Sequence, residues 1–143
     1  MKIIQSSIDT SEAFITNILN KNTKKKLNIE TITEKIALEL KIEHEIYGAI
    51  TGKIMNETLH INGFAVLEKF RGRGFGTQLI SAIEKEGLAR GAKKITVHTQ
   101  CYQALTFYKS HGYQVFGQLE DVPFKGTTKY YLFKDCAVAD DAL

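Results

Sequence analysis

The sequence feature that most constrains the fold is a turn rich in glycine and arginine, RGRGFG at residues 71–76. Strand-like sequence precedes this turn and ends near Leu67, and apolar residues at helical spacing follow it from Phe75 to Leu88. The first turn of a helix carries backbone N–H groups without intrahelical partners, and glycine lets a ligand approach such groups closely. The turn therefore predicts an anion site, most naturally for phosphate, at a strand-to-helix junction.

The spacing of the glycines excludes the two common nucleotide motifs. Gly72, Gly74 and Gly76 run as G-x-G-x-G, which is neither the Walker A pattern nor the dinucleotide fingerprint G-x-G-x-x-G. A tight strand-to-helix corner without any ligand is the alternative interpretation. Arg71 and Arg73 favour the anion site, because guanidinium groups add charge and forked donors to the turn.

Hydrophobic periodicity and turn residues predict the other elements of the chain. Strands are expected over residues 2–7, 34–42, 45–55, 58–67, 92–99, 113–120 and 128–134. Helices are expected over residues 9–21, 74–91 and 103–112, and the basic stretch 22–28 is expected to be a surface connector. The order βαβββαβαββ indicates a mixed α+β fold, with one domain over residues 1–135 and a frayed tail over residues 136–143.

Composition narrows the class of protein. The formal net charge is +3, with 19 basic and 16 acidic side chains, which is too mild to indicate a nucleic-acid binder. Cys101 and Cys136 form no metal-binding pattern, so no metal is expected. The N-terminus has no signal peptide pattern and no apolar run approaches membrane-spanning length, so we expect a cytoplasmic protein without a membrane partner.

Two motifs in order resemble the GNAT family of acetyl-CoA-dependent N-acetyltransferases. The family signature [QR]-x-x-G-x-[GA] matches Arg71, Gly74 and Gly76, and ALTFYKSHGYQVFG, from residue 104, is similar to the family segment A-x-x-[FL]-Y-x-x-x-G-[FY]. The proline of the family run before the signature is missing here. The resemblance extends over residues 33–135 and implies a central, mostly antiparallel mixed sheet flanked by helices.

The resemblance also implies how acetyl-CoA is bound. The amides from Arg71 to Thr77 would hold the pyrophosphate, and Ala65 and Val66 would pair with the pantetheine arm. Many relatives carry an asparagine where this chain has Cys101, and a thiol is a poor hydrogen-bond donor. The implied coenzyme-binding residues are Ala65, Val66, Arg71, Gly72, Arg73, Gly74, Phe75, Gly76, Thr77, Cys101, Ala104, Phe107 and Tyr108.

The resemblance implies a catalytic role for Tyr108 beside the thioester sulfur and for the Val66 N–H beside the carbonyl oxygen. A phenol of ordinary pKa protonates a thiolate at a cost of about 2 kcal/mol, so Tyr108 either only hydrogen-bonds the sulfur or has a lowered pKa. Glu68 is a candidate general base. The alternatives are two strand histidines, two acids before the last strand, and deprotonation through water: His60, His98, Glu120 and Asp121 are the residues concerned.

The function implied is acetyl transfer from acetyl-CoA to a primary amine of an unidentified acceptor, by direct attack in a ternary complex. A covalent route through Cys101 is a minor alternative. A domain that binds acetyl-CoA without catalysis, as a sensor or interaction module, is the alternative from another class. Many relatives form dimers, so a homodimer is a further expectation.

Overall fold

The computed structural model describes residues 1–100 and 102–137, and the chain separates into two units, residues 1–32 and 33–143. Residues 1–7 form neither helix nor strand, so the strand expected over residues 2–7 is wrong. No neighbouring strand within the first unit is available to pair with this short apolar stretch, and an isolated strand is not stable alone. The single domain over residues 1–135 stays a prediction.

The first unit consists of helix α1, Ile8–Leu27, which is longer than predicted. The side chain of Ser7 caps its first turn by accepting from the Thr10 amide, and Asn28 ends it in the left-handed conformation. The helix includes the stretch expected to be a connector, because lysine is a good helix former and suits the negative end of the helix dipole. The apolar residues at helical spacing, Phe14, Ile15, Ile18 and Leu19, are all exposed.

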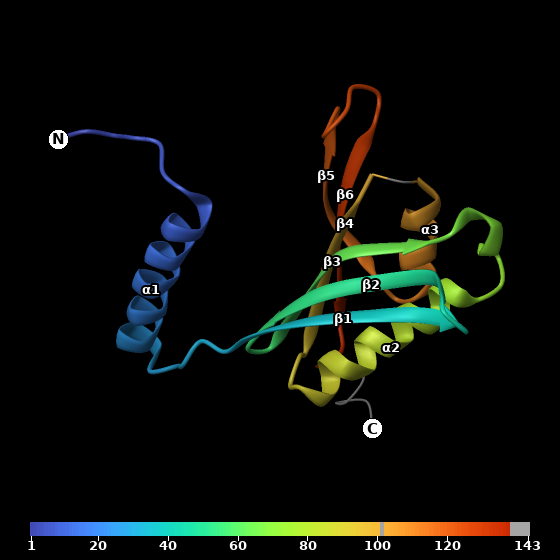
Figure 1. Cartoon of the computed structure of the whole chain (residues 1–143), viewed down its shortest axis with the longest axis horizontal. Coiled ribbons are helices and arrows are strands. Elements are labelled where there is room, and N and C mark those ends of the chain that lie inside the picture. The colour runs from blue at the N-terminus through green and yellow to red at the C-terminus, as the bar shows by residue number, and fades with distance from the viewer. Residues whose placement is uncertain (101, 138–143) are drawn as a thin grey trace. The chain divides into compact units, whose positions relative to one another are not determined.

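The second unit is a six-stranded mixed sheet with helices on one face (Figure 1). The strand order is β1-β2-β3-β4-β6-β5, and β3 and β4 are the parallel pair. The strands are β1 (Thr33–Ile42), β2 (Glu45–Met55), β3 (Thr58–Val66), β4 (Lys94–Thr99), β5 (Gln114–Glu120) and β6 (Thr128–Asp135). The helices are the short 3-10 turn η1 (Glu68–Phe70), α2 (Phe75–Ala89) and α3 (Tyr102–Ser110). The α+β class and the mostly antiparallel sheet are thereby confirmed.

The core lies between the sheet and helices α2 and α3. Alternate residues of β2 are buried against α2. This is the pattern expected when helices cover only one face of a sheet. Six side chains are almost completely buried: Ile50, Leu59, Ile80, Ile83, Ile95 and Leu132. The opposite face of β1 and β2 carries exposed polar residues, among them Lys35, Glu39, Thr51 and Lys53.

The end of the described chain is part of this core rather than a tail. Cys136 is 7% exposed, and its amide donates to the Lys93 carbonyl oxygen over 2.8 Å. The expected tail boundary at Cys136 is therefore too early. A buried thiol packs as a small apolar side chain, so Cys136 belongs to the core. The rest of that tail, residues 138–143, lies outside the described residues. No helix in the described ranges is long and apolar enough to cross a membrane.

Glu84 on α2 connects that helix to the β5 and β6 end of the sheet. Its Oε2 accepts from the Tyr113 hydroxyl and from the Lys134 ammonium, both over 2.9 Å, and its side chain is 13% exposed. We expect Glu84→Ala to lower the free energy of unfolding in urea by about 2–3 kcal/mol, because it leaves a hydroxyl and a charge without their acceptor. Glu86→Ala, which removes an exposed pair with Arg90, is expected to cost less than about 1 kcal/mol. Equal losses in the two variants would contradict this assignment.

Candidate active site

The site forms where β3 and β4 separate. The two strands pair only from Thr58 to His60 and from Lys94 to Thr96, and beyond that point they diverge (Figure 1). Asn62 contributes to the divergence, because it is an extra residue in β3: Thr51 pairs with Gly63 and Gly52 pairs with Ile61. Such a bulge bends its strand and increases the local twist.

A cavity of about 500 Å³ opens between the diverging strands. Its walls come from the second half of β3, the end of β4, the glycine turn and helix α3. Ten of the residues expected to bind coenzyme line it: Ala65, Val66, Arg71, Gly72, Gly74, Gly76, Thr77, Ala104, Phe107 and Tyr108. The lining also includes Asn62, Phe64, His98, Thr99 and Gln103, which the sequence did not assign to the coenzyme. Cys101 lies outside the described residues.

The backbone of β3 presents hydrogen-bonding groups to this cavity. The Leu67 amide donates to the Tyr47 carbonyl of β2, and peptide groups alternate in direction along a strand. The peptide groups of Ala65, which pairs with Ala49, therefore face β2, whereas those of Val66 and Phe64 face β4 and the cavity. This geometry agrees with an amide donor at Val66. It replaces Ala65 with Phe64 as the second residue able to pair with an extended ligand.

The glycine turn leaves its amides available. Gly72 and Gly74 have φ angles of 79° and 81°, and a Cβ at either position would meet no atom within 4 Å. Gly74 precedes α2, and the first intrahelical bond runs from Gln78 to the Gly74 carbonyl. In the part of the chain that the structure describes, the amides of residues 72–77 donate to no backbone acceptor, whereas the Arg71 amide donates to Glu68. A run of free amides at a helix start fits a pyrophosphate.

The two arginines of the turn have different positions. Arg71 lines the cavity, and its Nε donates to the Val66 carbonyl over 3.2 Å. The Arg73 guanidinium lies 5.4 Å above the Phe70 ring and does not line the cavity. Phe70 also stacks on Tyr47 at a centroid distance of 3.8 Å, and Phe75 joins this cluster. Phe75 therefore packs against Tyr47 and Phe70, and it does not line the cavity as the coenzyme prediction implied.

Helix α3 closes the cavity against the glycine turn. A Cβ at Gly76 would lie 3.3 Å from a ring carbon of Phe107. Glycine at this position therefore allows α2 and α3 to pack closely, in addition to leaving room for a ligand. Nε2 of His111 lies 3.2 Å from the Thr77 hydroxyl, and Nδ1 lies 2.8 Å from the Phe107 carbonyl. Because the carbonyl can only accept, Nδ1 carries the proton in this arrangement.

Tyr108 is buried at 3% exposure and its ring packs against Phe64, Phe107 and Tyr113. Burial raises the pKa of the Tyr108 phenol to about 12. The alternative of a lowered pKa is therefore wrong for the protein without ligand. The phenol remains protonated throughout the physiological range, so it can donate a hydrogen bond to a sulfur atom placed in the cavity.

The candidate bases are not equally placed. Glu68 lies on η1, is exposed and does not line the cavity, whereas His98 on β4 lines it. Desolvation lowers the pKa of His98, and Lys129 and His60 lower it further by charge repulsion. His60 is held by a 2.7 Å hydrogen bond between Nδ1 and the Thr96 hydroxyl, and its pKa is also lowered by desolvation. In the sequence, His98 could be identified as a candidate base from its position on β4, the strand that follows α2.

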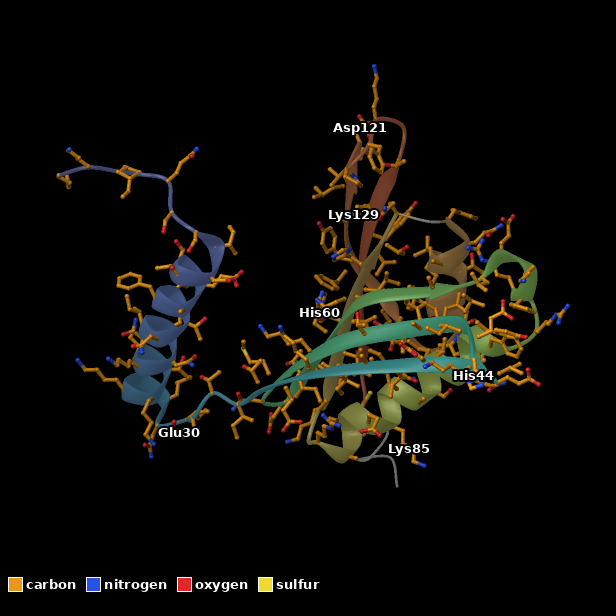
Figure 2. All side chains as sticks on the ribbon, in the orientation of Figure 1. Glu30, His44, His60, Lys85, Asp121 and Lys129 are labelled. Atoms are coloured by element: carbon orange, nitrogen blue, oxygen red, sulfur yellow. The ribbon has the colours of Figure 1, made fainter. Side chains whose placement is uncertain are left out.

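The acids before the last strand lie at the β5–β6 hairpin, Glu120 at the end of β5 and Asp121 in the turn. Asp121 has a φ of 58°, and its Oδ1 accepts from the Gly126 amide over 2.7 Å. Neither Asp121 nor Glu120 lines the cavity. Figure 2 shows Asp121 at the far tip of the β5–β6 hairpin, away from His60 on β3. Asp121 therefore stabilises the hairpin turn, Glu120 ends β5, and neither lines the cavity.

The arrangement has a defined chemical capacity. Free amides at the helix start can bind a diphosphate, the Val66 amide can stabilise an oxyanion, and the Tyr108 hydroxyl can donate to a leaving group. Neither Asp nor Glu lines the cavity among the described residues. A neutral imidazole at His98 is the titratable group there that can accept a proton near neutral pH.

Comparisons with known proteins identify the family. The family model described as acetyltransferase (GNAT) family matches residues 13–113. Over 63 residues, 41% of this chain and 45% of the relative, the chain is 41% identical to acetyltransferase YE1169 of Yersinia enterocolitica; the match spans less than half of that curated relative.

Among solved structures, an acetyltransferase from Bacillus cereus is 31% identical with a TM-score of 0.81. The comparison covers 94% of this chain and 98% of that protein. An aminoglycoside 6'-N-acetyltransferase complexed with coenzyme A has a TM-score of 0.63 at 17% identity, over 94% of this chain and 97% of that one, which shows the shared fold. The chain belongs to the GNAT family of acetyltransferases.

Proposed function

We propose that the protein transfers the acetyl group of acetyl-CoA to a primary amine by direct attack in a ternary complex. The observation that carries the proposal is that free amides of the glycine turn, the cavity-facing peptide of Val66 and the buried Tyr108 hydroxyl share one cavity. Family membership supports acetyl-CoA as the donor. The fold neighbour named as complexed with coenzyme A agrees with this choice of ligand.

The reaction joins the amine nitrogen to the thioester carbonyl carbon and then breaks the C–S bond. The Val66 N–H donates to the carbonyl oxygen as it gains negative charge. The thiolate leaves, and the proton lost by the amine nitrogen balances the charge when the thiolate is protonated to the free thiol of coenzyme A. With a phenol pKa of about 12 against about 8.5 for a thiol, full proton transfer from Tyr108 costs about 5 kcal/mol. Tyr108 therefore acts as a hydrogen-bond donor to the sulfur.

His98 is proposed as the group that accepts the amine proton, in place of Glu68. An amine must be neutral to attack, and a lysine-type ammonium has a pKa of about 10.4, so a base or a water relay is needed. His98 lines the cavity and Glu68 does not. Asn62 and Thr99 line the cavity as well and offer polar groups for a relay water.

An amine panel with acetyl-CoA tests the proposal. Free thiol release should accompany the mass increase of an acetyl group on the accepting amine. Coenzyme binding without acetylation of any amine would contradict the proposed function and favour a binding module.

The pH dependence of the reaction tests His98. We expect kcat/KM to fall on the acid side as His98 gains a proton, below its ordinary pKa of about 6.5, because burial and Lys129 disfavour the charged form. Lys129→Gln should move this acid limb to higher pH, since it removes a repelling charge and lets the pKa of His98 rise. His98→Asn should abolish the limb and lower kcat/KM.

Among the described residues, the charged and titratable groups facing His98 are His60 on β3 and Lys129 and Tyr131 on β6, so His60 and Tyr131 stay unchanged while Lys129 or His98 is substituted. Figure 2 shows His60 and Lys129 on these two strands. An acid limb that is the same in wild type, Lys129→Gln and His98→Asn would exclude His98 as the base.

A further inference from the structure

We propose, on the basis of the acetyltransferase function above, that the acceptor is a small amine that also carries a carboxylate or phosphate group. Lys35 and Lys53, on the sheet face opposite α2, would hold that anionic group. The proposal rests on the strand register, on the lack of ion pairs at both lysines within the described residues, and on a hollow that shares the lining residue Asn62 with the cavity.

The register places two lysines and a histidine in one row across the sheet. Lys35 of β1 pairs with Lys53 of β2, and Lys53 pairs with His60 of β3. Directly opposite residues of antiparallel strands have Cβ atoms about 4.5–5.5 Å apart and project from the same face. Like charges in this relation destabilise a sheet, so the Lys35–Lys53 pair costs stability unless an anion lies between the two ammonium groups.

The acids near this row are engaged elsewhere. Glu39, on the same strand as Lys35, pairs with Lys41 at 3.2 Å. Glu34 accepts from Arg90 at 2.9 Å, on the α2 side of the sheet. Within the described residues neither Lys35 nor Lys53 forms an ion pair, so the row keeps its positive charge.

A hollow of about 470 Å³ is lined by both lysines of this row and by Asn62. Asn62 lines both the hollow and the cavity. The floor beside the lysines is made of the next pair on the same face, the small side chains of Ala37 and Thr51, so a ligand can lie close to the backbone. A molecule that spans the two spaces would present its amine near His98 and its anionic group to the lysines.

The charges of both spaces discriminate among amines. Among the described residues, no Asp or Glu lines either the cavity or the hollow. A polycationic amine would meet Lys35 and Lys53 without a counter-charge from the lining, which disfavours its binding. A carboxylate or phosphate on the acceptor converts the same field into attraction, and its effect falls as ionic strength rises.

Matched amines test the substrate class. Glucosamine against glucosamine 6-phosphate, and tyramine against tyrosine, differ mainly in the anionic group, while spermidine and kanamycin represent polycations. We expect kcat/KM to be at least about 10-fold higher for an anionic member than for its partner, in line with removal of one charge-assisted contact. A larger kcat/KM ratio for the glucosamine pair would indicate a phosphate on the acceptor, and a larger ratio for the tyramine pair would indicate a carboxylate.

The double variant Lys35→Glu, Lys53→Glu should raise KM for the anionic amine about 10-fold or more, with kcat nearly unchanged and no change for the uncharged partner. Lys85→Glu is the control, because Lys85 is an exposed lysine on α2 at the other side of the sheet (Figure 2). In the presence of saturating coenzyme A, inorganic phosphate should shift the backbone amide resonances of Lys35 and Lys53 in wild type and not in the double variant.

The outcomes separate the two proposals. Acetylation of neutral or polycationic amines in preference to their anionic counterparts, or a missing phosphate effect at Lys35 and Lys53, would overturn this inference and leave the transferase function intact. Failure of every amine despite coenzyme binding would overturn the proposed function and this inference with it.

Discussion

Gly74→Asp is expected to weaken coenzyme A binding about 100-fold, equivalent to about 2.7 kcal/mol, in isothermal calorimetry. Gly74 has a φ of 81° directly before α2, and it lines the cavity beside amides that have no backbone acceptor. The carboxylate would compete for these amides and repel the pyrophosphate. A side chain in the left-handed region also carries strain, which lowers stability independently of the ligand.

Gly91→Asp separates these two effects. Gly91 follows the C-terminal end of the same helix with a φ of 95°, and a Cβ there would also meet no atom within 4 Å. Both variants therefore carry the strain of a left-handed side chain, and only Gly74→Asp should lose affinity for coenzyme A. Unchanged affinity in Gly74→Asp would refute the anion site at this turn.

Tyr108→Phe is expected to lower kcat about 100-fold while leaving the dissociation constant for acetyl-CoA within about 2-fold, because the hydroxyl acts on the sulfur as charge develops. The phenol forms no hydrogen bond among the described residues, and the ring keeps its contacts with Phe107 and Tyr113, so the variant should fold normally. Because burial raises the pKa of Tyr108 to about 12, the wild-type rate should show no alkaline limb from this group below about pH 11.

Tyr113→Phe is the matched control for this variant. Tyr113 is 2% exposed and also lies in the core, but its hydroxyl donates to Glu84 rather than into the cavity. We expect its removal to cost about 1–2 kcal/mol of stability and to leave kcat unchanged. Loss of turnover in Tyr113→Phe, or wild-type turnover in Tyr108→Phe, would contradict the assignment of the hydroxyl.

The sequence predicted the elements whose formation depends on local patterns. Apolar spacing and terminal glycines located α2 and α3, and alternation located the strands of the second unit. Residues 2–7 show where this failed, because a short apolar stretch carries no information on whether a partner strand exists for it. The length of α1 was underestimated for a related reason, since lysines suit both a connector and a helix end.

Within the candidate site, the sequence located the backbone more accurately than the side chains. It placed Val66 and the glycine turn at the cavity, but the direction of a peptide group depends on strand pairing, so Phe64 and Ala65 could not be distinguished. Arg73 and Phe75 belong to the same motif as Gly74, yet their side chains contact Phe70 and do not line the cavity. The role of Gly76 depends on Phe107, which is distant in sequence.

By itself the sequence determined the strand-to-helix turn with available amides, because glycine conformations and helix starts are set by neighbouring residues. Only the tertiary structure decided which residues share the cavity. The bulge at Asn62 and the short β3–β4 pairing separate the strands, and this separation brings His98, Val66 and Tyr108 around one space. The charge on the opposite sheet face was likewise decided by register, because pairing sets Lys35 beside Lys53 although they are distant along the chain.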